Sequence, residues 1–416
     1  MKQFVVTGLL LLVFYCGYAQ RDTLSIKQIM ALKAKPPVAG ISYELGGANS
    51  RVPFASLIDL ALSDFLNEQQ KDEILSRTGN GLRFGYWQSL DISYEQPAYY
   101  TLDAYTPGSY FHIENQLFTG SRLTDNGLRL FLNGNKQFAG QEVELGPSQF
   151  ESWWYTNLKY RYEALLDSIP YKLDVGIVVG HEYSAYDVRK ASIFTESNGE
   201  YLDADLEYVI RETRSNSPIP FGGLGMATGF EISMPLRDQK YRLDFKIEDL
   251  GVVFWSGLEE TRVDSAFRFR GANFESIFDL NDSLVAAERD RIQNGFFNGT
   301  TDGYAALMPF NVNFRFAKPC KDAKYLKELY ALAEYRYLTA YIPRLGVGSL
   351  WHFNPRHILR GELTYGGFNT LALGVSYQLT LAERYRFTLG SQNILAWALP
   401  GIFTGSSVGV GAYYIF

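Results

Sequence analysis

A long alternation of apolar and polar residues with a period of two constrains this chain more than any other feature. It is clearest in Tyr241–Glu248, written YRLDFKIE, where aromatic or aliphatic residues fill one register and charged residues fill the other. Because successive side chains of a strand point to opposite faces, this pattern predicts strands with one apolar and one charged face. Such runs predict about fourteen strands. They begin near Gly81, Ser152, Tyr171, Leu202, Gly229, Tyr241, Asp264, Gly303, Leu326, Arg344, His357, Asn369, Tyr385 and Ser407.

Alternation alone also fits a soluble β-sandwich or propeller, and this alternative stays open. Three features favour a membrane barrel. Several runs extend over about 11–14 residues, whereas globular strands usually hold about 5–6 and tilted membrane strands need about 9–11. The polar faces mix both signs of charge along one strand, as a barrel interior does. The last run, Ser407–Phe416, keeps its apolar residues in one register and ends on an aromatic residue.

Composition agrees with this fold class and excludes others. The chain has 416 residues with 29 Tyr, 29 Phe and 38 Gly, yet its mean hydropathy is −0.13. A helical multi-span protein is excluded, because such a protein needs repeated apolar stretches of about 20 residues. The net charge of −6 and the pI near 5.5 argue against a nucleic-acid partner, since phosphate binding depends on clustered Lys and Arg.

Residues 1–19 are predicted to be a cleaved signal peptide. A basic start is followed by an apolar stretch too short to span a bilayer, and Ala19 offers a small residue at the cleavage point. A lipoprotein signal at Cys16 fits less well, because Tyr15 stands where that processing needs a small residue. Cleavage after Ala19 leaves a single cysteine, Cys320, so no intramolecular disulfide is expected.

The mature chain is predicted to have two parts. Helical periodicity in Arg21–Lys35 and Ala55–Leu75 predicts that residues 20–80 form an N-terminal periplasmic or lumen-plugging segment. Residues 81–416 are predicted to form the barrel. The predicted fold class is therefore all-β: a transmembrane antiparallel β-barrel of about 14 strands with a short N-terminal helical or plug segment.

Counting strands back from a periplasmic C-terminus predicts which connections lie on each side of the membrane. On the periplasmic side we expect Phe353–Arg356, Thr380–Arg384 and Glu212–Leu224. Outside we expect Gln96–Phe150, Ser184–Gly199, Arg237–Lys240 and Ala272–Asp302. Glu212–Leu224 is long for a periplasmic turn and Arg237–Lys240 is short for an outer loop. Four tryptophans at predicted strand ends suggest interfacial aromatic belts: Trp153, Trp154, Trp255 and Trp397.

The charged registers predict the side chains that line the barrel interior. These are Arg242, Asp244, Lys246, Glu248, Asp203, Asp205, Glu207, Arg268, Arg270, Glu334 and Arg336, with Arg360 and Glu362. Opposite charges on neighbouring strands can pair, and pairing would stabilise a closed lumen. The same charges could instead tune the selectivity of a polar channel. The sequence leaves both interpretations open.

The sequence predicts no catalytic, cofactor-binding or metal-binding site. His112, His181, His352 and His357 are scattered without metal-ligand spacing, and Asp279–Ser283 begins like a calcium loop but lacks its glycine. Gly405–Gly409 matches G-x-S-x-G but precedes a strand, whereas a nucleophile elbow precedes a helix. Phe221–Gly229 is glycine-rich but lacks the strand-and-helix context of a dinucleotide loop. We therefore predict a non-enzymatic protein without cofactor.

The chain resembles a family of Bacteroidota outer-membrane β-barrels of unknown function. The segments that carry the resemblance are Leu128–Gln141, Ser152–Tyr162, Tyr171–Gly180 and Tyr241–Trp255. The barrel with its N-terminal segment is also distantly similar to long-chain fatty-acid transporters, in which that segment plugs the lumen. The aromatic C-terminus, Phe416, resembles the assembly signal of such barrels. The resemblance implies outer-membrane localisation, contact with lipid and with the barrel-assembly machinery, and a small-molecule or lipid solute.

Two functional hypotheses follow. In the first, the barrel passes a small, or hydrophobic, solute. In the second, it is a structural or interaction barrel with a closed, charge-filled lumen that presents Gln96–Phe150 and Ala272–Asp302 to an unknown protein partner.

Overall fold

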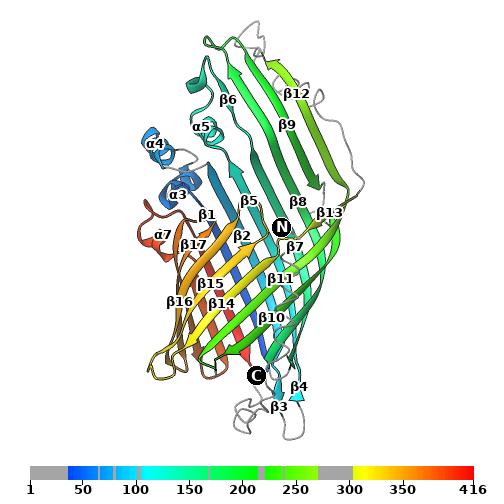
Figure 1. Ribbon diagram of the computed structural model, residues 1–416, viewed down its shortest axis with the longest axis vertical. Coiled ribbons are helices and arrows are strands. Elements are labelled where there is room, and N and C mark those ends of the chain that lie inside the picture. Colours follow the sequence, from blue (N-terminus) through cyan, green and yellow to red (C-terminus); the bar gives the residue numbers. More distant parts are fainter. Residues whose placement is uncertain are drawn as a thin grey trace.

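Fourteen antiparallel strands close into a barrel in the part of the chain that the structure describes (Figure 1). The computed structural model describes residues 36–63, 66–77, 81–100, 105–166, 169–213, 221–237, 239–269 and 303–416. One sheet holds 18 strands; β6, β9 and β12 lie beyond the ring and β13 continues into β14, which leaves fourteen. The predicted all-β barrel is thus confirmed.

Around the ring, each strand pairs with the next and the last pairs with the first. The first half consists of β1 (Val38–Asn49), β2 (Leu82–Gln96), β5 (Gly108–Leu123), β7 (Ser148–Leu166), β8 (Ile169–Thr195), β10 (Gly223–Leu236) and β11 (Tyr241–Ser256). The second half consists of β13 (Gly303–Leu307) with β14 (Asn311–Pro319), β15 (Leu326–Arg336), β16 (Ile342–Asn354), β17 (His357–Gly367), β18 (Leu371–Leu381), β19 (Tyr385–Ser391) and β20 (Gly405–Ile415).

Strand β1 closes the barrel, which corrects the predicted boundary at Gly81. Its residues pair with β20 from Val38↔Ile415 to Ala48↔Gly405, and with β2 along its whole length. Part of the predicted segment 20–80 is therefore barrel wall. The sequence pattern hid this strand because glycines at 40, 46 and 47 interrupt its alternation. The predicted signal peptide, residues 1–19, and Arg21–Lys35 lie outside the described residues.

The described helices lie at one rim of the barrel, where β8 and β9 rise above the wall; we call it the extension rim (Figure 1). Helix α3 (Phe54–Ser63) is tied to the loop after α7 (Ile394–Ala398) by the hydrogen bond from Phe54 N to Phe403 O, 2.9 Å. Helix α4 (Glu68–Ser76) packs Ile74 against Leu128 of α5 (Asp125–Asn133). In the described part of the chain α3 and α4 lie beside this rim and do not plug the lumen. No helix described is long and apolar enough to cross a membrane.

The guanidinium of Arg51 holds these helices together. Its Nε donates to Ile74 O (3.0 Å) and its Nη2 to Leu75 O (2.8 Å), which satisfies carbonyls at the end of α4. It also forms an ion pair with Asp125, the first residue of α5. The hydrogen bond from Arg51 lowers the pKa of Asp125, and Arg129 acts in the same direction.

This contact predicts an acid-sensitive α5. Because the folded pKa of Asp125 is depressed, its contribution is present above about pH 4 and is lost as the pH falls through the folded pKa. We expect hydrogen-exchange protection factors of the α5 amides to drop between pH 5 and pH 2. In Asp125→Asn they should already be low at pH 5 and change little. Equal wild-type protection at both pH values would contradict this role of Asp125.

Strand β5 corrects the predicted topology. It runs through Gln96–Phe150, which was expected to be one outer loop, and separates residues 97–107 from residues 124–147. Phe353–Arg356 and Thr380–Arg384 lie at the rim that holds Phe416, as expected; we call it the C-terminal rim. Strand β10 runs from the extension rim to the C-terminal rim, where its Ile232 pairs with Tyr171 near the start of β8. Arg237–Lys240 follows β10 at the C-terminal rim, and Glu212–Leu224 leads into it from the extension rim. Both connections were therefore predicted on the wrong side. Ala272–Asp302 lies outside the described residues.

Beyond the extension rim, part of the wall continues as an open sheet. Strand β8 has 27 residues, and its upper half pairs with β6 (Glu142–Glu144) and β9 (Leu202–Thr213), which pairs with β12 (Leu258–Phe269). Ser184–Gly199, expected to be a loop, is thus largely strand. The predicted strands that begin at Leu202 and Asp264 form this extension and are not part of the barrel wall. The predicted total of about fourteen holds because β1 and β5 replace them.

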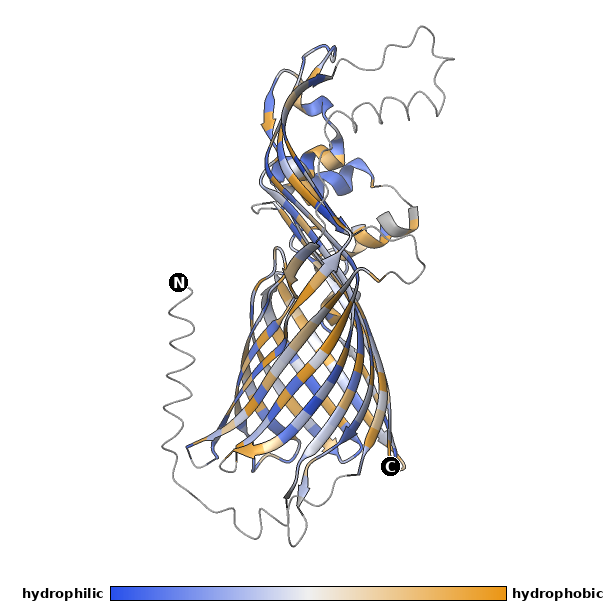
Figure 2. Cartoon of the chain, turned by 90° about the vertical axis from the view of Figure 1, so that its right-hand side faces the viewer, coloured by the Kyte–Doolittle hydropathy of each residue, from blue (hydrophilic) through white to orange (hydrophobic). Residues whose placement is uncertain are grey.

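Hydrophilic and hydrophobic residues alternate along the strands of the barrel (Figure 2), and the exposed side chains show that the apolar register forms the outer surface. On β8, Val175 is 59% exposed and Ile177 is 56% exposed, while Asp174 and Val178 on the other face are buried. Neighbouring strands continue this surface with Leu158 of β7 and other aliphatic or aromatic side chains. A closed ring with an apolar outside leaves no unpaired wall edge and suits a lipid environment.

Candidate functional site

The charged register of β11 faces the barrel interior, as the alternation predicts. Arg242 pairs with Asp244 on its own strand (2.8 Å) and with Glu328 of β15 (2.9 Å). Lys246 pairs with Glu248 at 2.5 Å. Two of these pairs lie within β11 and the third reaches across β14 to β15, and together they neutralise charge inside the wall.

Two further predicted residues, Glu334 and Arg336, also lie inside the ring, near the end of β15. Glu334 forms an ion pair with Arg344 of β16, with 2.5 Å between Oε2 and Nη2. The guanidinium carbon of Arg336 lies 4.2 Å from the ring centroid of Phe118, a cation–π contact with β5. Both residues line an internal cavity with Glu248.

Four predicted lumen residues lie elsewhere, because their strands form the extension. Asp203 pairs with Arg268 (2.6 Å), and Asp205 pairs with Lys190 (2.5 Å), all on exposed side chains. Glu207 contacts Arg189 at 3.4 Å. Alternation reports which face of a strand is charged, but whether that face encloses a lumen depends on which strands pair. Arg270 lies outside the described residues.

The centre of the interior network is a lysine absent from the predicted set. Lys159 of β7, whose side chain is 3% exposed, contacts Glu114 (2.8 Å) and Asp249 (3.0 Å). Asn157 also donates to Asp249, at 2.9 Å. On the same strand, Arg161 pairs with Asp174 of the neighbouring β8. The polar register of Ser152–Tyr162 contained this signal, but its partners come from strands far apart in sequence.

A bulge in β11 turns Asp249 inward. The register between β10 and β11 shifts between Thr228 and Phe230, and Asp249 adopts φ +58°. An extra residue inverts the alternation beyond it. Trp255 therefore lies inside the barrel, 2% exposed, although unbroken alternation from Glu248 would turn it outward.

An aromatic cluster fills the interior at the extension rim; we call it the aromatic plug. Its members are Phe118, Trp153, Tyr155, Tyr183, Trp255 and Phe368, all buried in one cluster with Met308 and Leu338. The ring centroids of Trp153 and Tyr183 lie 4.7 Å apart, and those of Trp153 and Trp255 lie 5.7 Å apart. Trp153 and Trp255 are thus core residues, which corrects their predicted place in an interfacial belt. Trp397, in contrast, is 53% exposed on α7.

Two short loops, β15–β16 and β17–β18, extend across the lumen and place side chains in the plug. The β15–β16 loop reaches β7, where Glu151 Oε2 accepts from Thr339 N (3.2 Å) and Thr339 Oγ1 (2.7 Å). By the shorter path around the ring, β8, β10, β11 and β14 lie between β7 and β15. Phe368, after β17, reaches β2 in the same way. A Cβ at Gly85 would overlap the Phe368 ring, and one at Gly120 would overlap Thr339 O.

Beneath the plug lies a cavity of about 350 Å³, which we call the acidic chamber. Phe118, Leu338, Tyr341 and Phe368 line it on the plug side. Its remaining lining comes from both halves of the ring, so the chamber lies in the barrel interior. Its acids are Glu44, Asp91, Glu114, Glu248, Asp249 and Glu334.

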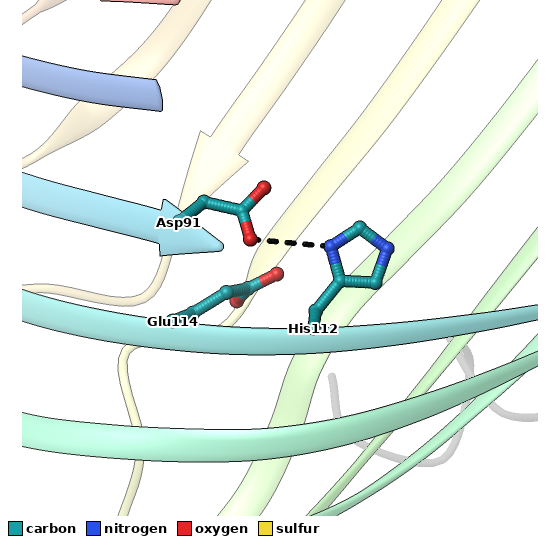
Figure 3. A group of neighbouring side chains, drawn as sticks. All are labelled: Asp91, His112 and Glu114. Carbon is teal, nitrogen blue, oxygen red and sulfur yellow. Dashed lines mark hydrogen bonds and ion pairs between the residues drawn. The ribbon is translucent and has the colours of Figure 1, made fainter. Parts of the chain in front are cut away.

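One group of side chains at the chamber has the composition of a metal site. Asp91 of β2 and His112 and Glu114 of β5 point into the same space, with ligand atoms within 4.8 Å of one another (Figure 3). Asp91 Oδ1 and His112 Nδ1 are 3.2 Å apart. Lys159 lies 2.8 Å from Glu114 and already supplies a positive charge there, so we assign no metal to this group.

Closure, strand length, an apolar outside and a charged inside together define the class. The chain folds as an antiparallel β-barrel like those of outer-membrane proteins. No protein-family model matches the sequence, and no curated protein matches it.

Several solved barrels are similar in structure. The toluene transporter TodX of P. putida shares 8% identity over 93% of this chain and 92% of that chain, with a TM-score of 0.41. The CymD monoaromatic hydrocarbon channel shares 8% identity over 96% and 95%, with a TM-score of 0.32. The translocator domain of the autotransporter NalP from Neisseria meningitidis shares 7% identity over 94% of each chain, with a TM-score of 0.32. Likenesses this distant say nothing about what the chain binds.

Proposed function

We propose that this protein is an outer-membrane barrel that passes a small solute through its lumen and is closed at rest by the aromatic plug. The C-terminal rim faces the periplasm and the extension rim faces outside. The observation that carries the proposal is the chamber of about 350 Å³ directly beneath two loops that cross the lumen. Its size falls within the range of about 300–1,000 Å³ of small-molecule sites.

A second interior space supports a path from the periplasmic side. A cavity of about 580 Å³ lies at the C-terminal rim and is lined by Val38 of β1, Tyr110 of β5 and Ile415 of β20. Arg161, Lys172 and Arg386 also line it, together with Glu95 and Glu163. A solute between these spaces would meet charged and polar groups that can replace its water contacts.

Swelling of proteoliposomes in isosmotic arabinose tests solute passage. A variant with Leu338→Gly and Phe368→Gly, which we call the loop variant, lacks the two loop side chains of the plug. We expect liposomes with the loop variant to swell quickly and liposomes with wild type to swell slowly. Deleting residues 20–80 is unsuitable, because β1 belongs to the wall. If the correctly folded loop variant causes no swelling, the passage hypothesis is wrong.

The extension favours a second candidate function, a structural or interaction barrel. Strands β8, β9 and β12 stand beyond the rim and carry exposed ion pairs such as Arg268–Asp203 and Lys190–Asp205. Such pairs contribute little to stability, so a charged sheet in this place suits a binding surface. Absence of swelling in both wild type and the loop variant would favour this candidate.

We also propose that Phe416 serves barrel assembly. Its amide donates to Pro37 O (3.0 Å), and its ring, 61% exposed, makes edge contacts with Tyr94 and Tyr414. Deleting Phe416 should lower the yield of heat-modifiable barrel in the outer membrane several-fold. Tyr385→Ala, which removes another exposed ring near the C-terminal rim, is the control. Equal yields of the deletion and wild type would exclude an assembly role for this residue.

A further inference from the structure

The acidic chamber holds more negative than positive charge. Six carboxylates line it: Glu44, Asp91, Glu114, Glu248, Asp249 and Glu334. Four cations offset them, since Arg336 and Arg344 line the chamber and Lys159 and Lys246 pair with its acids. The difference, six minus four, leaves an excess of two negative charges when His112 is neutral.

The excess resides on two identifiable side chains, Glu44 and Asp91. Glu44 Oε1 accepts from Trp87 Nε1 (2.9 Å) and Gln392 Nε2 (2.7 Å), which are neutral donors. Asp91 has His112 as its neighbour. Within the described ranges neither carboxylate contacts a Lys or Arg. Residue 44 pairs with Ser89 and Asp91 lies two residues further along β2, so both acids face the same part of the chamber.

The chamber also offers aromatic faces to a ligand. Trp87, Phe118, Tyr341 and Phe368 line it.

We propose that the acidic chamber binds a small organic cation, an ammonium group attached to an apolar or aromatic body. The ammonium lies between Glu44 and Asp91 and donates hydrogen bonds, while the apolar body packs against the aromatic side chains of the plug. Aromatic faces attract cations as well as apolar groups, and carboxylates supply the stronger charge interaction. This inference rests on the proposed passage function and names the class of solute.

Isothermal titration of the purified full-length barrel in detergent with benzylammonium tests the proposal. Benzyl alcohol has nearly the same shape without the charge, and benzoate carries the opposite charge. We expect benzylammonium to bind at least about tenfold more tightly than benzyl alcohol, and benzoate not to bind. Glu44→Gln and Asp91→Asn should each weaken benzylammonium by about tenfold or more.

Glu95→Gln is the matched control, because Glu95 lies on the same strand as Asp91 but lines the cavity at the C-terminal rim. It should leave the affinity unchanged. Equal binding of benzylammonium and benzyl alcohol, or no loss in Glu44→Gln and Asp91→Asn, would overturn the cation site. If these two variants bind normally while the loop variant still swells in arabinose, the cation site fails and passage stands. If benzylammonium binds as expected but no solute enters, passage fails and the site stands.

Discussion

Replacing Phe368 and Leu338 together by alanine should convert a silent barrel into a conducting one in planar bilayers. Wild-type protein is expected to show no steady current steps, because buried apolar side chains at the extension rim exclude water and ions from that part of the lumen. Both side chains sit on loops that cross the lumen, and Phe368 is 5% exposed and Leu338 7% exposed. Their loss should leave the hydrogen-bonded wall intact and produce discrete current steps.

The matched control is Phe387→Ala with Leu389→Ala on β19. It removes the same two side-chain types from the lipid-facing surface, where they are 43% and 57% exposed. This control should stay silent. Gly85→Leu provides a second way to open the plug, since its side chain would displace the Phe368 ring. If wild type shows the same current steps as the variant with Phe368→Ala and Leu338→Ala, the plug does not close the lumen.

Replacing Lys159 by methionine should produce the largest loss of stability. The change keeps an unbranched apolar side chain that is one atom shorter, but leaves Glu114 and Asp249 facing each other with no ammonium between them. Breaking a buried ion pair by removing one partner typically costs about 3–5 kcal/mol, because a charge stays buried without compensation. We expect a clear fall in the urea midpoint at which heat-modifiable gel mobility is lost.

Two variants make this result interpretable. Lys190→Met breaks the exposed Lys190–Asp205 pair of the extension and should leave the midpoint nearly unchanged. Adding Glu114→Gln and Asp249→Asn to Lys159→Met removes the stranded charges and should restore much of the loss. If Lys159→Met unfolds at the wild-type midpoint, the network does not stabilise the barrel.

The sequence was most informative where a strand keeps its alternation without interruption. The faces of β11 up to Glu248 and of β7 around Lys159 followed directly from the period of two. Prediction failed where glycines replace the pattern, as in β1, and where the Asp249 bulge inverts it, as at Trp255. It also failed for Arg268, because a charged register looks the same in a barrel wall and in an open extension.

The order of residues alone predicts a β protein of long strands with apolar and charged faces, and it predicts the number of strands closely. It could do so because alternation is a local property of neighbouring residues. Three features are visible only in the folded chain: β1 pairs with β20, two loops cross the lumen to form the plug, and Glu44 and Asp91 face one chamber. These contacts join residues far apart in the chain, and they form only when the ring closes.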